Sequence, residues 1–107
     1  MQLSTTFRGL NQSEINIANR ALERQMQRMG RFADRAAILR AVVDANSPEH
    51  SVNLKLLVGG EDYLAQSTDY DLPTAITSAV DRLRSQLLRS RGRRETNRQR
   101  RISSAAA

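Results

Sequence analysis

The hydrophobic residues of this chain recur with two different periods, and the points where the period changes define its elements. In four segments apolar and polar residues alternate, a pattern typical of strands that bury one face. In two longer segments apolar residues return every three or four positions, which indicates amphipathic helices. The alternating segments are 2–8, 36–45, 51–58 and 61–68, and the helical segments are about 14–34 and 72–91.

Turn-forming residues separate these segments. Gly9 ends the first strand, and Asn11 or Ser13 can cap the helix that follows. Residues 46–49, Asn-Ser-Pro-Glu, are a turn sequence between the second and third strands. Residues 59–60 are both glycine, and two glycines between alternating segments predict a tight hairpin, because both tolerate positive φ.

The predicted element order is therefore β-α-β-β-β-α. The first two strands are joined through a helix, so we expect them to be parallel with a right-handed crossover. The next strands follow each other through short turns and should be antiparallel. Each helix has a single apolar stripe that it must bury on a sheet. The simplest solution is an α+β fold, a four-stranded sheet with two helices packed on one face.

The positive charge of the chain lies at its C-terminal end. Residues 1–81 carry a net charge of −2, whereas residues 82–107 hold nine arginines and one acid, a net charge of +8. Such a concentration predicts a polyanionic partner, either nucleic acid or an anionic membrane surface. Nucleic acid is favoured, because clustered basic residues are typical of nucleic-acid-binding proteins. We divide the chain into an α+β domain, residues 1–91, and a basic C-terminal tail, residues 92–107, expected to be disordered when free.

Arginines also form rows on both predicted helices. On the first helix the row lies away from the apolar stripe at spacings of three and four, and its members are Arg20, Arg24, Arg28, Arg31 and Arg35. Like charges at this spacing repel each other, so an unpaired row is best explained by an anion beside it. On the second helix Arg82, Arg89 and Arg93 follow one flank, and Arg84 and Arg91 follow the other.

The sequence offers few residues suited to catalysis or metal binding. There is no cysteine, and the single histidine, His50, stands near Pro48 and Glu49, where it reads as a solvated turn residue. We therefore expect no enzyme activity, no metal, no cofactor and no small-molecule substrate. The N-terminus lacks the pattern of a secretory signal and no apolar run has the length of a membrane span, so we expect a cytoplasmic protein without a membrane partner.

Four stretches resemble the ribosome hibernation-promoting factors, also called the protein Y family. They are MQL at the start, MGRFADRA at 29–36, NLKLLVGGE at 53–61 and DLPTAITSAVDRLRSQL at 71–87. The resemblance covers about residues 1–91 and rests on the collinear combination of these stretches. Pro73 and Thr77 depart from the family pattern, which usually has an aromatic residue and an acid at these positions. Too few residues follow Arg91 for the family's C-terminal dimerisation domain, so the chain resembles the short form.

The resemblance implies the fold derived above, together with a ribosomal partner. It implies translation inhibition by binding to the small ribosomal subunit and its rRNA, in the channel of mRNA and tRNA, with the free protein a monomer. It assigns RNA binding to Arg28 on the first helix and to four positions on the second: Arg82, Arg89, Arg91 and Arg93. The helical stripe adds Arg20, Arg24 and Arg31 to the expected RNA-binding residues.

Two other interpretations remain at this point. The first is a protein-interaction module that docks through the outer face of the sheet, where Ile38, Val42 and Leu57 are expected. The second is binding to any nucleic acid through the basic tail alone. Co-sedimentation with ribosomal particles separates the ribosomal interpretation from the first, and truncation after Arg91 separates it from the second.

Overall fold

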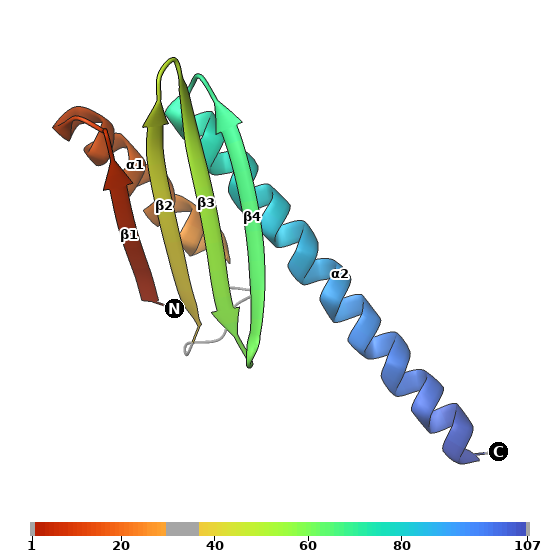
Figure 1. The fold of residues 1–107 in the computed structure, drawn as a ribbon. Helices are drawn as coiled ribbons and strands as arrows, with labels where there is room; N and C mark the ends of the chain where they lie inside the picture. The colour runs from red at the N-terminus through yellow and green to blue at the C-terminus, as the bar shows by residue number, and fades with distance from the viewer. Residues whose placement is uncertain (1, 30–36, 107) are drawn as a thin grey trace.

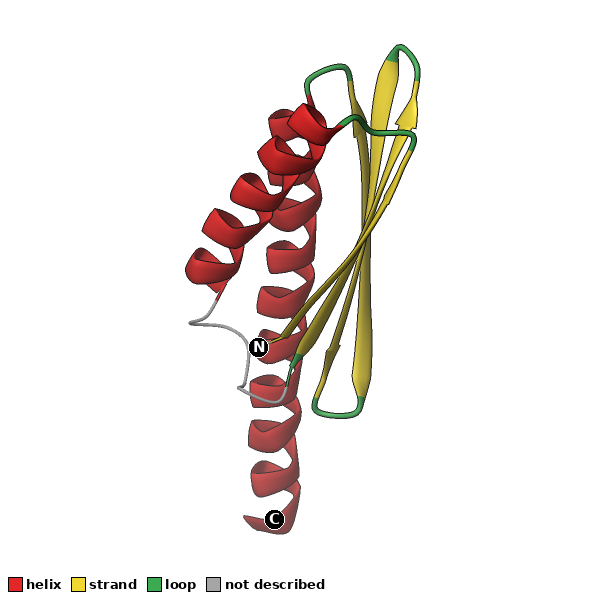
Figure 2. Ribbon diagram, turned by 90° about the vertical axis from the view of Figure 1, so that its left-hand side faces the viewer, coloured by secondary structure: helices red, strands yellow, loops and turns green. Residues whose placement is uncertain are grey.

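Four strands form one mixed sheet, and both helices pack on the same side of it (Figure 1, Figure 2). The computed structural model describes the backbone of residues 2–29 and 37–106 and the side chains of residues 2–29 and 37–90. The elements are β1 (Gln2–Arg8), α1 (Gln12–Met29), β2 (Ile38–Asn46), β3 (Glu49–Val58), β4 (Glu61–Asp69) and α2 (Leu72–Ala106). The α+β class, the element order and the one-sided helix layer predicted from the sequence are confirmed.

The strands lie in the order β1-β2-β3-β4. β1 pairs parallel with β2, and the register places Leu3 beside Leu39. β2 with β3 and β3 with β4 are antiparallel, joined by tight hairpins. In the second hairpin Gly59 and Gly60 have φ angles of 58° and 76°, the left-handed region that glycine enters at no steric cost. The predicted hairpin and its cause are therefore confirmed.

The core lies between the sheet and the helix layer. α1 contributes Ala18, Leu22 and Met29, all fully buried, at the spacing predicted for its apolar stripe. The sheet and α2 contribute the rest, which includes Leu39, Ala41, Val43, Val52, Leu54, Leu56, Ala75, Ile76, Ala79, Val80 and Leu83. Alanines on both sides of this interface bring the helices close to the strands, so a short chain fills its core at high density.

The helix and strand ends differ from the sequence prediction by a few residues. α1 begins at Gln12, two residues earlier than expected, because Asn11 caps it. β3 begins at Glu49, so His50 belongs to a strand and not to a turn. The expected end of the first helix near Asp34 and the expected start of the second strand at Ala36 lie outside the described residues.

α2 continues far past the sheet. In the structure α2 continues as one helix to Ala106. The division into a domain of residues 1–91 and a basic tail of residues 92–107, disordered when free, stays a prediction. A helix is locally possible here, because the segment contains no proline and many of its residues are arginine or alanine, both good helix formers, with Gly92 as its weakest position. At 1.5 Å per residue the helix spans about 52 Å, and it runs the length of the 62 Å molecule (Figure 1).

No helix among the described residues combines the length and the hydropathy that a membrane crossing requires.

Candidate nucleic-acid interface

Three arginines follow the solvent side of α1. Arg20, Arg24 and Arg28 are exposed, while Ala18, Leu22 and the rest of the buried stripe face the sheet. Their spacing of four residues places them on one side of the helix, about one turn apart. The row predicted from the sequence therefore exists on the surface as far as Met29, and Arg31 lies outside the described residues.

This row has no internal counter-charge in the part of the chain that the structure describes. No described carboxylate lies within 4.0 Å of Arg20, Arg24 or Arg28, although Glu23 is on the same helix. Neighbouring cations at this spacing cost a few tenths of a kcal/mol each in a helix. An anion that bridges them would remove this cost, and a phosphate backbone supplies anions in a row.

Arg82 of α2 has a different position. Its Nη1 donates a hydrogen bond to the backbone carbonyl of Gln66 on β4. One turn later Gln86 donates to the carbonyl of Leu64, and one further turn along the Ser90 hydroxyl lies 2.9 Å from the Tyr63 hydroxyl. This side of α2 therefore follows the outer edge of β4. α1 lies toward β1 and β2, so Arg82 is on the flank of α2 that faces away from α1 (Figure 1).

Arg89 lies near the end of the described side chains and is exposed. No carboxylate of residues 2–29 or 37–90 pairs with it. Arg91 and Arg93 are on the helical extension of α2, and only their backbone is described. Of the eight arginines predicted to bind RNA, four are described as free exposed cations: Arg20, Arg24, Arg28 and Arg89.

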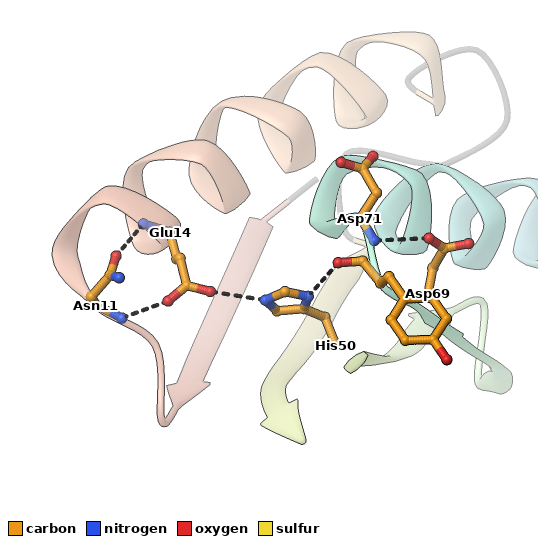
Figure 3. Close-up of polar contacts among 6 residues, drawn as sticks. Asn11, Glu14, His50, Asp69 and Asp71 are labelled. Atoms are coloured by element: carbon orange, nitrogen blue, oxygen red, sulfur yellow. Dashed lines mark hydrogen bonds and ion pairs between the residues drawn. The ribbon is translucent and has the colours of Figure 1, made fainter. Parts of the chain in front are cut away.

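A cluster of polar residues fixes the starts of both helices (Figure 3). Asn11 Oδ1 accepts a hydrogen bond from the Glu14 N–H at 2.8 Å, and Glu14 Oε1 accepts one from the Asn11 N–H at 3.2 Å. This reciprocal pair is a capping box at the N-terminus of α1. At α2, Asp71 accepts hydrogen bonds from the N–H and the hydroxyl of Thr74, so Asp71 is the N-cap residue.

His50 links the capping box of α1 to the segment just before α2. Its Nε2 lies 2.8 Å from Glu14 Oε2, and its Nδ1 lies 3.1 Å from the carbonyl oxygen of Tyr70 (Figure 3). Both partners are acceptors, so the two bonds form together only when both ring nitrogens carry a proton. The interpretation of His50 as a solvated turn residue was wrong, because its side chain connects α1, β3 and the segment before α2. No local pattern could have shown this, since its partners are 36 and 20 residues away.

The hydrogen bonds of the cluster favour the ionised carboxylates. The pKa of Glu14 lies below its ordinary value, first because His50 donates to it and second because of the Asn11 N–H. The pKa of Asp71 is lowered as well, mainly by the hydroxyl and then by the N–H of Thr74. Both helix N-termini are thus occupied by anions of the chain itself, so the cationic row of α1, and not a helix terminus, is the candidate contact for an external polyanion.

The two helices lie side by side, but their arginines do not form one compact patch. The α1 row faces outward from the helix layer, Arg82 is held at the β4 edge, and the basic extension projects beyond the sheet (Figure 1). These three cationic regions therefore lie at separate places on the molecule. Metal binding finds no support within the described ranges, where no group of three His, Asp or Glu side chains converges.

The solved structures that share this fold include two whose printed names refer to Protein Y and to the ribosome. The N-terminal domain of Protein Y from Thermus thermophilus matches with a TM-score of 0.70 and 24% sequence identity over 83% of this chain and 98% of that chain. A ribosomal subunit interface protein from Coxiella burnetii matches with a TM-score of 0.64 and 14% identity over 86% of this chain and 99% of that chain. Both alignments span nearly the whole of the known chains, so the complete domain is shared.

Sequence comparison adds no further relative. No protein-family model and no curated protein matches this chain. The fold is therefore established by structure, and it is the fold that the sequence resemblance implied.

Proposed function

We propose that this protein is a ribosome-associated factor that inhibits translation by occupying the small subunit. Three observations support the proposal. The fold is shared with Protein Y and with a ribosomal subunit interface protein. Four stretches of the sequence resemble the same family. The helix side of the domain displays arginines that lack described internal partners. The row of Arg20, Arg24 and Arg28 is the observation on which the RNA contact depends.

In the proposed mechanism the domain fills the mRNA and tRNA channel of the small subunit. The arginines of the α1 row, together with Arg89, contact phosphates of rRNA. Arginine suits this role because its planar guanidinium binds phosphate oxygens in a bidentate manner. Folded RNA can be recognised through shape and backbone, without reading bases. Occupancy excludes mRNA and tRNA, so the ribosome becomes inactive while the factor stays bound.

Arg82, Arg91 and Arg93 complete the set that the family resemblance implies. Arg82 has a structural bond at the β4 edge and also an exposed side chain, so it can contact RNA through its remaining guanidinium donors. Arg91 and Arg93 continue the basic helix beyond the sheet. We propose that the free protein is a monomer that acts in the cytoplasm and that it needs no cofactor.

Sedimentation tests this function. Purified protein is mixed with small ribosomal subunits and run on a sucrose gradient at 50 mM and at 200 mM salt. We expect the protein to travel with the particles at low salt. Each neutralised phosphate contributes roughly −0.7 to −0.9 to the log–log salt slope, so the α1 row and Arg89 alone, with four contacts, lower the affinity about 50- to 150-fold over this range. Protein that stays at the top of the gradient at 50 mM salt contradicts the proposal.

Translation provides the second measurement. Addition of the protein to a cell-free translation reaction should reduce synthesis in proportion to the fraction of small subunits bound. An excess of small subunits should restore it. Inhibition that does not respond to added subunits would contradict a mechanism based on channel occupancy.

A further inference from the structure

The face of the sheet opposite the helices is open in the described part of the chain, and it is not flat (Figure 2). A depression of about 390 Å³ lies over β2, β3 and β4. This volume is within the range typical of ligand pockets. Its lining includes the side chains of Arg40, Val42, Asn53, Lys55, Leu64 and Gln66. None of these residues takes part in the proposed rRNA contact.

Two cations meet at this depression. Arg40 on β2 and Lys55 on β3 are direct cross-strand partners, and like charges in this position destabilise a sheet. Lys55 has Asp62 at 3.6 Å, and the neighbouring carboxylate of Asp44 is paired with Arg8 at 4.0 Å. Arg40 is exposed and has no ion-pair partner among the described residues. A ligand carboxylate between Arg40 and Lys55 would therefore complete the charge pattern of this face.

Apolar side chains lie beside the cations. Leu64 is the cross-strand partner of Lys55 and is 62% exposed, although a leucine in a sheet is usually covered. Val42, two residues after Arg40 on the same strand, also lines the depression and is half-buried. Ile38 and Leu57 are cross-strand partners further along the same face and are half-buried as well. A ligand for this face must therefore be both acidic and aliphatic.

The chemistry of the face favours protein over nucleic acid. Single-stranded RNA is usually held by bases stacked on aromatic rings. The lining of the depression contains no aromatic residue, and the hydroxyl of Tyr63, on β4, reaches α2 on the other side of the sheet. The β4 edge is also occupied, since the carbonyls of Leu64 and Gln66 accept hydrogen bonds from Gln86 and Arg82. A segment at this depression would therefore contact the face through side chains and would not pair as a strand with β4.

We infer that the open face of the sheet binds a segment of a partner protein that presents acidic and aliphatic side chains on the same side. One carboxylate of the segment lies between Arg40 and Lys55, and separate aliphatic side chains of the segment cover Leu64 on β4 and Val42 on β2. The site is on the opposite side of the sheet from the α1 arginine row, so both surfaces can be occupied at once. The inference stands on this face alone and does not require the ribosomal function.

The test uses the full-length chain labelled with ¹⁵N, in 150 mM salt, and a synthetic peptide of the repeat Glu-Ser-Leu-Ser (the glutamate–leucine peptide), which places glutamate and leucine on one side of an extended chain. A matched peptide replaces each leucine by serine, which keeps the charge and removes the apolar component. We expect the glutamate–leucine peptide to shift the amide resonances around Arg40, Val42, Lys55 and Leu64 saturably. The serine peptide should bind at least tenfold more weakly at these amides, although it can still contact the basic end of α2.

Charge reversal provides the decisive variant. Arg40→Glu with Lys55→Glu should lose the glutamate–leucine peptide at this face and gain a lysine–leucine peptide of equal length. Leu64→Ser, at an exposed position that leaves the core intact, should weaken the first peptide about tenfold. Arg24→Glu on α1 is the matched control and should leave the peptide's effect on these amides unchanged. All three variants are checked for native circular dichroism.

Several outcomes overturn the inference. They are an absence of saturable shifts on this face, equal binding of the leucine and serine peptides there, and unchanged peptide binding in Leu64→Ser. A single-stranded RNA oligonucleotide that shifts the same amides more strongly than the peptide also overturns it, because the face would then be a second nucleic-acid surface.

Discussion

His50 on β3 and Glu14 on α1 approach to 2.8 Å between Nε2 and Oε2. The same imidazole binds the carbonyl of Tyr70, just before α2. One side chain from the sheet therefore connects the first turn of α1 with the residue that precedes the N-cap of α2. Because the arginines of α1 start only six residues after Glu14, this link also fixes where the cationic row stands relative to the sheet.

The first prediction concerns the acid stability of this link. The pKa of folded Glu14 lies below the ordinary value of 4.5, so its ionised form stabilises the fold at every pH above that value. This contribution is lost as the pH falls below about 4.5, the ordinary value for a glutamate, toward the lower pKa of the folded state. Glu14→Gln should lower the stability at pH 7 and flatten the pH dependence below 4.5.

Urea unfolding of both proteins between pH 3 and pH 7 measures the difference. His50→Ala should flatten the acid limb in the same way, because it removes the main cause of the lowered pKa. Glu23→Gln, an exposed position on the same helix, is the control and should keep the wild-type profile. Parallel profiles for Glu14→Gln and the wild type would show that the His50 contact has no energetic role.

The second prediction concerns the α1 arginine row. Arg20→Glu with Arg24→Glu should reduce binding to small subunits at least tenfold and lower the log–log salt slope by roughly 1.4 to 1.8, because two phosphate contacts are lost. The stability should not fall, since both residues are exposed. Sedimentation at several salt concentrations measures the slope. Arg40→Glu changes a charge on the opposite face and should leave the slope as it is.

The third prediction separates two arginines of α2. Arg82→Ala removes a bond to the Gln66 carbonyl, so we expect a loss of about 0.5–1.5 kcal/mol in the free energy of unfolding. Arg89→Ala should leave the stability unchanged and lower the salt slope of ribosome binding by roughly 0.7 to 0.9. Urea unfolding and sedimentation of both variants test this contrast. Equal stability of the two variants would argue against a structural role for Arg82.

The fourth prediction concerns the hairpin between β3 and β4. The φ of Gly60 is 76°, and an added Cβ would meet no atom within 4 Å, so the cost of substitution is backbone strain and not a clash. Gly60→Val should therefore destabilise the fold by roughly 1–2 kcal/mol, since branched residues avoid this region. Gly60→Asn should cost less, because asparagine enters it more readily. Equal melting temperatures for the two variants would contradict this explanation.

Local patterns in the sequence predicted most of the fold. The alternation in residues 2–8 gave the observed limits of β1, and Gly59-Gly60 gave the hairpin, because strand faces and tight turns depend on neighbouring residues. The buried positions of α1 and α2 also followed from their period. The helical course of α2 beyond Arg91 did not follow from the apolar period, because low hydrophobicity indicates an absence of packing and does not forbid a helix.

The candidate site was predicted less completely. The exposed row on α1 could be read from helical spacing, since exposure follows from the position of the apolar stripe. The bond from Arg82 to Gln66 and the His50 link could not, because each joins residues far apart in the sequence through a specific rotamer. The depression at Arg40 and Lys55 depends on the register of β2 with β3, which the turn length allowed but did not specify.

The side chains of Arg82 and Gln86 close one border of the sheet, whereas β1 has only β2 as its neighbour. If two molecules were to associate through their strands, each could offer only its β1 border. Such a union is symmetric and complete at two copies, because no second border remains to receive a third. With two side chains of a helix over the other border, strand pairing alone would give such molecules no route to a filament.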